Sequence, residues 1–234
     1  MSTFALVHGG WHGAWCWERL VPELELRGHR VVTMDLPCDD NTASFDDYAD
    51  TVCAALADVP DDDLVVVGHS LAGLTIPLVA ARRPVRRLVY LCALLPLAGR
   101  SLRQQMADDV TMLDPGYTKG LAKTGSGQST WVDAELSHHH LFGDCDDATA
   151  TAAFARLRPQ ATFPYTAPAP MNPLPTVEST YVVCTEDRMV NPDWSRRAAP
   201  DRLNGDVIEL PGSHSPFYSR PVQVAELLDH VARS

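Results

Sequence analysis

The chain has 234 residues, of which 45% are hydrophobic and 21% charged, and its formal net charge is −11. This balance fits one globular domain, or one domain with a modest insertion. The negative charge argues against a nucleic-acid partner, because such partners require a positive surface, and the apolar runs are too short to cross a membrane.

The six cysteines include no C-x-x-C pair, and the chain opens directly on an apolar run, Phe4–Val7. Even cysteine counts suggest disulfide frameworks mainly in short secreted chains. We therefore expect free thiols in a reducing cytoplasm. The sequence leaves the formation of a homodimer open.

Short apolar runs alternate with helical patterns, which predicts an α/β fold with a mostly parallel sheet of about six strands. Most of these runs are continuous, as in strands that helices cover on both faces. The predicted strands are Phe4–His8, Val31–Asp35, Leu64–His69, Leu88–Leu94, Thr180–Thr185 and Val207–Leu210.

Four helices are predicted between and after these strands. Gly28 suits the left-handed position that ends the first helix, and Ser44 suits the N-cap of the second. The third follows Ser70 and ends before Pro84, with Pro77 inside it as a source of bending. The remaining predicted bounds are Cys16–Arg27, Phe45–Ala57 and Val222–Ala232.

Residues 96–175 show no clear strand and only weak helical patterns, at Arg100–Asp109 and Ala148–Arg158. We interpret them as a mainly helical cap inserted into a core formed by residues 1–95 and 176–234. Insertions of this size over an active site are often lids. A surface excursion without regular structure is the alternative.

A buried strand runs through Val67 into Gly68-His-Ser70-Leu-Ala72 and then directly into a helix. This context is typical of the G-x-S-x-G nucleophile elbow, which presents a serine to a catalytic base. Ala72 replaces the second glycine of the motif, and we expect the elbow to tolerate one methyl group. A serine that only caps the helix is the structural alternative.

The first predicted strand is followed by His8-Gly9-Gly10-Trp11. A His-Gly-Gly run at this place is typical of the second part of an oxyanion hole. The backbone N–H groups of Gly10 and Leu71 are the candidate donors. Gly9, Trp11, His12 and His69 are candidates for the substrate pocket, because apolar and aromatic groups line such sites.

α/β-Hydrolases place their triad in the chain order serine, acid, histidine. Two histidines follow the last predicted strand. His214 lies in the loop after that strand and is the better base, whereas we expect His230 at the surface of the last helix. A loop can bring an imidazole over the edge of the sheet.

Asp187 follows the preceding strand and is the predicted acid, which would orient the imidazole. Glu186 and Asp193 are the rivals, and we expect Asp193 to cap the next helix instead. Asp35 precedes Ser70, which is the wrong order, so we interpret it as structural. We expect no metal at His138-His-His140, because three adjacent histidines cannot face one ion in regular structure.

These segments resemble the small esterases and hydroxynitrile lyases of the α/β-hydrolase superfamily, which include plant methyl-ester esterases and bacterial esterases. The segments that carry the resemblance span nearly the whole chain in the same order. They are residues 6–17 (LVHGGWHGAWCW), 28–37 (GHRVVTMDLP), 68–73 (GHSLAG), 184–188 (CTEDR) and 212–214 (GSH).

The resemblance implies a triad of Ser70, His214 and Asp187 that needs no cofactor, and oxyanion donors at Gly10 and Leu71. The lyases carry a threonine at the position of Gly9 and a lysine at that of Ser215. We therefore expect hydrolysis of a small-molecule ester rather than cleavage of a cyanohydrin. The alternatives are a hydrolase for a lactone, amide or carbon–carbon bond, and a non-catalytic ligand-binding protein.

Overall fold

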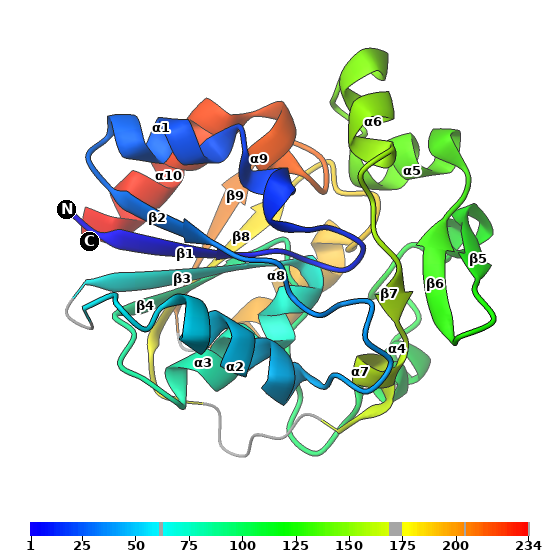
Figure 1. Cartoon of the computed structure of the whole chain (residues 1–234), viewed down its shortest axis with the longest axis horizontal. Coiled ribbons are helices and arrows are strands. Elements are labelled where there is room, and N and C mark those ends of the chain that lie inside the picture. The colour runs from blue at the N-terminus through cyan, green and yellow to red at the C-terminus, as the bar shows by residue number, and fades with distance from the viewer. Residues whose placement is uncertain (61–62, 169–174, 204, 234) are drawn as a thin grey trace.

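A sheet of six parallel strands lies at the centre of the computed structural model, which describes residues 1–60, 63–168, 175–203 and 205–233 (Figure 1). The strand order is β2-β1-β3-β4-β8-β9. The strands are β1 (Thr3–Val7), β2 (Arg30–Thr33), β3 (Leu64–His69), β4 (Arg87–Leu91), β8 (Glu178–Cys184) and β9 (Gly205–Leu210).

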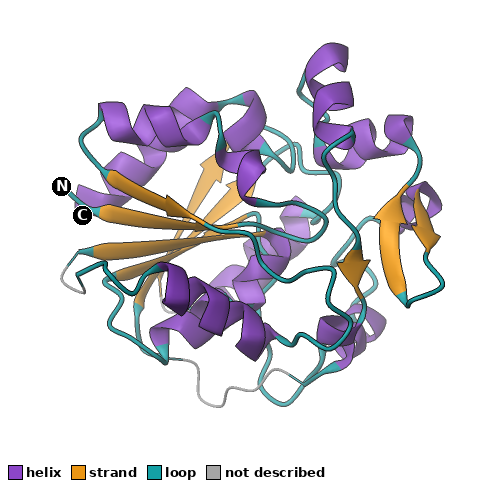
Figure 2. Cartoon of the chain, in the orientation of Figure 1, coloured by secondary structure: helices purple, strands orange, loops and turns teal. Residues whose placement is uncertain are grey.

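Helices cover both faces of this sheet (Figure 2), which confirms the predicted α/β class. Helices α1 and α10 pack against each other on one face, whereas α2 and α3 pack together on the other (Figure 1), and α8 contacts β8 and β9. These helices are α1 (Leu20–Leu26), α2 (Phe45–Ala55), α3 (Ile76–Ala80), α8 (Pro192–Arg202), α9 (Pro216–Ser219) and α10 (Pro221–Arg233).

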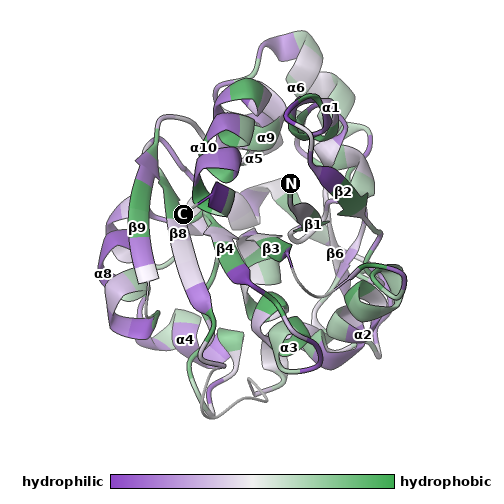
Figure 3. Cartoon of the chain, turned by 90° about the vertical axis from the view of Figure 1, so that its left-hand side faces the viewer, coloured by the Kyte–Doolittle hydropathy of each residue, from purple (hydrophilic) through white to green (hydrophobic). Residues whose placement is uncertain are grey.

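The central strands are buried along their whole length, and β3 and β4 expose no residue. Figure 3 shows hydrophobic residues along both strands, between the two layers of helices. The edge strand β9 exposes residues at four of its positions. The continuous apolar runs in the sequence therefore identified the strands that helices cover on both faces.

Two predicted helices are divided in the structure. The first begins as a 3₁₀ turn, η1 (Ala14–Trp17), before α1, and the third begins as η2 (Ser70–Leu74) before α3. Pro77 lies in the first turn of α3, where its missing N–H costs no hydrogen bond. Gly28 has a φ of +84° just after α1, as its predicted capping position requires.

The segment between β4 and β8 extends beyond the carboxyl ends of β1 and β3 (Figure 1). Helices α4 and α6 occupy the two predicted helical patterns, but α5 and α7 were not predicted. Its elements are α4 (Leu102–Asp108), η3 (Pro115–Gly120), β5 (Leu121–Lys123), β6 (Gln128–Trp131), α5 (Ala134–Leu141), α6 (Asp147–Phe154), β7 (Gln160–Ala161) and α7 (Phe163–Thr166).

The expectation that this segment holds no strand is wrong. Strands β5, β6 and β7 form a separate antiparallel sheet. They are too short, at three, four and two residues, to leave a period in the sequence. The end of the predicted cap, residues 169–174, lies outside the described residues. Among the described residues, no helix is both long and apolar enough to span a membrane.

Candidate active site

Ser70 lies in the sharp turn between β3 and η2. Its φ is +52°, a left-handed conformation that residues other than glycine rarely adopt. Gly68 makes the turn possible, because a Cβ there would lie 2.8 Å from Cγ2 of Ile76. Ala72 is buried in the turn that follows, so its methyl group is accommodated. The turn places Ser70 at the carboxyl edge of the sheet.

The loop after β9 brings His214 to Ser70. Its Nε2 lies 3.0 Å from Oγ of Ser70, and its Nδ1 lies 2.8 Å from Oδ2 of Asp187. A carboxylate only accepts hydrogen bonds, so Nδ1 carries the proton and Nε2 is free to accept one from the serine. The loop after β8 therefore supplies the group that fixes the tautomer of His214.

Backbone groups hold Asp187 in place. Its Oδ1 accepts hydrogen bonds from the N–H groups of Met189 at 2.7 Å and Val190 at 3.0 Å. The side chains of Asp187 and His214 are each 1% exposed. A buried carboxylate paired in this way has a fixed direction, which orients the imidazole.

The structure separates the rival residues from Ser70 and His214. Glu186 is exposed, and so is His230 on α10. Asp193 forms an ion pair with Arg196, and the N-cap of α8 is Asn191, so the capping role expected of Asp193 is wrong. Asn191 takes that place because its side chain accepts from the N–H two residues later.

Asp35 has the structural role that its position predicted. Its Oδ1 accepts a hydrogen bond from the N–H of Ala14, at the start of η1, with a distance of 2.8 Å. It also lies 3.5 Å from a guanidinium nitrogen of Arg158. Both contacts hold loops together beside β1 and β2.

His69 and Cys92 fix the backbone of His214. Nε2 of His69 donates to the carbonyl oxygen of His214 at 2.9 Å, and Sγ of Cys92 lies 3.3 Å from the same oxygen. Burial, helped by the neighbouring His214, lowers the pKa of His69 well below its usual value. His69 therefore stays neutral, and its Nε2 keeps the proton that this bond needs.

Among the described residues, His69, Cys92 and His214 are the one group of three candidate metal ligands whose donor atoms all lie within 4.8 Å. Nε2 of His69 and Sγ of Cys92 contact the carbonyl oxygen of His214, and Nε2 of His214 contacts Oγ of Ser70. The arrangement thus serves to position the imidazole.

The loop after β1 approaches Ser70 very closely. A Cβ at Gly9 would lie 2.8 Å from Cβ of Ser70, so glycine is required there. A Cβ at Gly10 would lie 3.6 Å from Cδ2 of Leu71. The structure therefore brings residue Gly10 close to the side chain of Leu71, which follows Ser70, and the oxyanion role of their N–H groups stays a prediction.

The structure does not place His12 and His69 on a pocket wall as the sequence suggested. They are 1% and 0% exposed, and their rings pack edge to face at 5.4 Å. Nδ1 of His12 donates to the carbonyl of Gly10 at 2.9 Å. Both histidines therefore lie behind the active-site loops and brace them, because the ring stacks and backbone contacts leave no free surface.

Trp11 does line a cleft, as predicted. Its φ is +63°, and its Nε1 donates to Oγ of Ser129 at 3.2 Å. The cleft has a volume of about 190 Å³ and lies between the Trp11 loop and the segment between β4 and β8. Its lining residues are Trp11, Arg103, Met106, Tyr117, Leu121, Ser129, Thr162 and Tyr165.

The three adjacent histidines lie on α5 and have separate partners. Nε2 of His138 contacts the carbonyl of Cys145, Nδ1 of His139 contacts the guanidinium of Arg188, and Nδ1 of His140 contacts the carbonyl of Arg188. Their ring nitrogens thus point to different groups. His140 ties α5 to the loop that carries Asp187.

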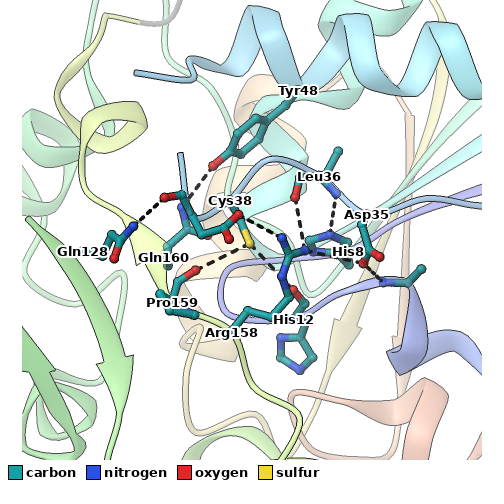
Figure 4. Close-up of polar contacts among 12 residues, drawn as sticks. His8, His12, Asp35, Leu36, Cys38, Tyr48, Gln128, Arg158, Pro159 and Gln160 are labelled. Carbon is teal, nitrogen blue, oxygen red and sulfur yellow. Dashed lines mark hydrogen bonds and ion pairs between the residues drawn. The ribbon is translucent and has the colours of Figure 1, made fainter. Parts of the chain in front are cut away.

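Sequence reasoning missed the residues that return from the segment between β4 and β8 to the active-site loops. The backbone N–H of Arg158 donates to the carbonyl of Trp11 at 2.7 Å, and that of Ala161 donates to the carbonyl of Cys38. Figure 4 shows Arg158 and Gln160 among the polar groups of the loop after β2. In the sequence these residues form the short run Arg158-Pro-Gln160, which has no periodic pattern that would predict their contacts.

Comparison with known proteins confirms the resemblance seen in the motifs. The model of the alpha/beta hydrolase family matches residues 4–227. Methylesterase 2 of Arabidopsis thaliana is 28% identical, with 98% of this chain and 95% of the relative covered. Esterase PIR7B of Oryza sativa is 27% identical, with 98% and 95% covered.

Solved structures share the fold. Polyneuridine aldehyde esterase superposes with a TM-score of 0.81 at 23% identity, over 99% of both chains. A pyrethroid hydrolase from Sphingobium faniae has a TM-score of 0.81 at 24% identity, over 100% of this chain and 98% of the other. With nearly all of its length matched by the family model, this chain belongs to the alpha/beta hydrolase family.

Proposed function

We propose that the chain hydrolyses small carboxylic esters through an acyl-enzyme on Ser70. The observation that carries this proposal is the buried chain of contacts from Ser70 through His214 to Asp187, with distances of 3.0 and 2.8 Å. A serine hydroxyl is a weak nucleophile, and a base oriented by a third group is what activates it.

In the proposed reaction, Nε2 of His214 removes the proton from Oγ of Ser70 as the oxygen attacks the ester carbonyl. Asp187 stabilises the imidazolium that forms. The backbone N–H groups of Gly10 and Leu71 bind the oxyanion, each contributing about 3 kcal/mol as in comparable sites.

The imidazolium of His214 then gives its proton to the departing alkoxide, and the acyl group stays on Ser70. His214 next removes a proton from a water molecule, which attacks the acyl-enzyme and releases the acid. Every step uses groups of the chain and water.

The surroundings of Ser70 support hydrolysis over cyanohydrin cleavage. The lyases place a threonine where Gly9 stands, and here even a Cβ would meet Cβ of Ser70 at 2.8 Å. They place a lysine after the histidine, whereas this chain has the fully buried, uncharged Ser215. A departing cyanide would find no cation at that position.

The proposal includes the division into a core of residues 1–95 and 176–234 and a cap of residues 96–175. The cap would cover Ser70, which is 8% exposed. The names of the methylesterase relatives support a small alcohol part in the ester. The cytoplasmic location and the homodimer stay predictions.

The test is hydrolysis of short-chain p-nitrophenyl esters by the wild type and by Ser70→Ala. We expect turnover by the wild type and a loss of at least about 10³-fold in the variant. Turnover that survives the substitution would refute the assigned nucleophile. A folded wild type that is inactive on esters of every length would favour another bond, such as a lactone or amide, or a ligand-binding protein.

A further inference from the structure

Asp144 lies in the turn between α5 and α6 and reaches the loop that carries His214. Its Oδ1 accepts a hydrogen bond from Oγ of Ser213, the residue directly before His214. Its Oδ2 accepts from Oγ of Ser219 and from Nε of Arg220, each at 2.9 Å. One carboxylate from the segment between β4 and β8 therefore ties the loop after β9 to the end of α9.

Asp144 is ionised although its side chain is only 9% exposed. Burial acts to raise its pKa, but the hydrogen bonds from the three donors outweigh this effect, so the pKa lies below its usual value. Hydrogen bonds to an ionised acceptor are roughly twice as strong as those between neutral groups. Ser213 is itself 3% exposed. Loss of the carboxylate would therefore leave a buried hydroxyl without this acceptor, which is costly.

The contact at Ser213 acts on His214 from the side opposite to its other backbone contacts. The carbonyl oxygen of His214 is held by Nε2 of His69 and Sγ of Cys92. Ser213 lies on the other side of the His214 Cα atom, where the peptide group is planar and rigid. Contacts on both sides limit the φ and ψ angles of His214, and these angles direct its ring towards Ser70.

The same part of the chain also contacts the loop of the acid. Nδ1 of His140, on α5, donates to the carbonyl oxygen of Arg188 at 2.7 Å. Arg188 directly follows Asp187, and His140 is 2% exposed. Helix α5 and the turn after it therefore contact the residue after the predicted acid and the residue before the predicted base.

We propose that Asp144 is a positioning residue for His214, which it holds towards Ser70 through the hydroxyl of Ser213. This inference rests on the proposed function, in which His214 is the base. Asp144 exchanges no proton with the substrate. Its effect comes from geometry, because a displacement of a reacting group by about 1 Å can reduce the rate by about 10²-fold.

The test measures kcat and KM for p-nitrophenyl acetate in the wild type, Asp144→Ala, Ser213→Ala and the double variant. Labelling with a fluorophosphonate, run to completion, counts the competent sites in each sample. We expect kcat per labelled site to fall by about tenfold in each single variant, with kcat/KM falling equally, because the base acts in the transition state. The double variant should lose no more than Asp144→Ala alone, since both substitutions remove one link.

Asp193→Ala is the matched control, because it also removes a carboxylate that pairs with an arginine, Arg196, but on α8. It should keep the kcat of the wild type. Asp144→Asn keeps a group that can hydrogen-bond to Ser213 and should recover part of the lost kcat.

An unchanged kcat per labelled site in Ser213→Ala would overturn the proposed positioning and leave ester hydrolysis intact, even where Asp144→Ala fails to fold. A double variant whose loss equals the product of the two single losses would overturn it as well, because the two groups would then act independently. A folded wild type that hydrolyses no ester would overturn the proposed function and the positioning together.

Discussion

At the scale of single residues, three histidines beside the active site are kept neutral by burial. Burial lowers the pKa of His8 to about 4 and that of His12 to about 3, and it lowers the pKa of His69 well below its usual value. Nδ1 of His8 donates to the carbonyl of Gly9, and Nε2 accepts from the N–H of Leu36. Protonation of Nε2 would remove that acceptor, so the hydrogen bond from the N–H of Leu36 exists only in the neutral form of His8.

The free energy of unfolding should therefore depend on pH. In the unfolded chain these histidines take up protons below about pH 6.5, whereas the folded chain resists protonation down to about pH 4. The contribution of these neutral histidines to the free energy of unfolding is complete above pH 6.5. It is lost as the pH falls from 6.5 towards about 4. Linkage predicts a loss of about 2 kcal/mol per histidine between pH 7 and pH 5.

Urea unfolding of the wild type and of His12→Phe at pH 7 and pH 5 measures this effect. The difference between the two pH values should be smaller by about 2 kcal/mol in the variant, whatever its absolute stability. His230→Phe is the control, because His230 is exposed and should leave the difference unchanged. An equal difference in His12→Phe and in the wild type would contradict the buried neutral state of His12.

At the scale of elements, the close approach of η2 to the chain after β4 shapes the turn at Ser70. A Cβ at Gly73 would lie only 2.0 Å from the carbonyl oxygen of Leu94. The N–H of Leu94 in turn donates to the carbonyl of Ser70 at 2.9 Å. Backbone atoms on both sides leave no flexible group to move aside, so glycine is required at position 73.

Gly73→Ala should therefore lower the free energy of unfolding by at least about 2 kcal/mol, because overpacking displaces backbone. Chemical denaturation measures this. Gly125→Ala is the matched control, since a Cβ there meets nothing within 4 Å, and it should change stability by less than about 0.5 kcal/mol. A stable Gly73→Ala protein would show that the turn can relax.

The sequence predicted the elements whose pattern is local. Ser44 accepts from the N–H of Asp47 at the start of α2, as a capping box does, and β3 has its predicted bounds. The strands β5 and β6 were missed because, at three and four residues, they are too short to show an alternating period. The helix α5 was missed because its three histidines obscure the apolar period.

At the scale of the whole molecule, residues 158–161, which lead back from the segment between β4 and β8, join the predicted cap to the core. The guanidinium of Arg158 contacts the carbonyl of Leu36 at 3.2 Å and the carboxylate of Asp39 at 2.9 Å, and its backbone bonds to Trp11. Figure 4 shows Arg158 reaching across these loops. These contacts join positions about half the chain apart, so no local pattern could predict them. The contacts from Ser70 through His214 to Asp187, in contrast, were predictable from motifs in fixed order.

Arg158→Met should therefore misplace the loop of Gly10 and Trp11 and lower kcat/KM by about tenfold. The free energy of unfolding should fall by less than about 1 kcal/mol, because the ion pair is partly exposed. Arg196→Met breaks an exposed ion pair of α8 and serves as the control with unchanged kcat/KM. Unchanged kcat/KM in Arg158→Met would mean that this side chain does not position the loop.

The central claim is that Ser70 is the nucleophile, and labelling with a fluorophosphonate tests it most directly. We expect one adduct per chain on the peptide that contains Ser70, with activity lost in proportion to labelling and no adduct in Ser70→Ala. An adduct on another residue, or loss of activity with Ser70 unmodified, would contradict the account.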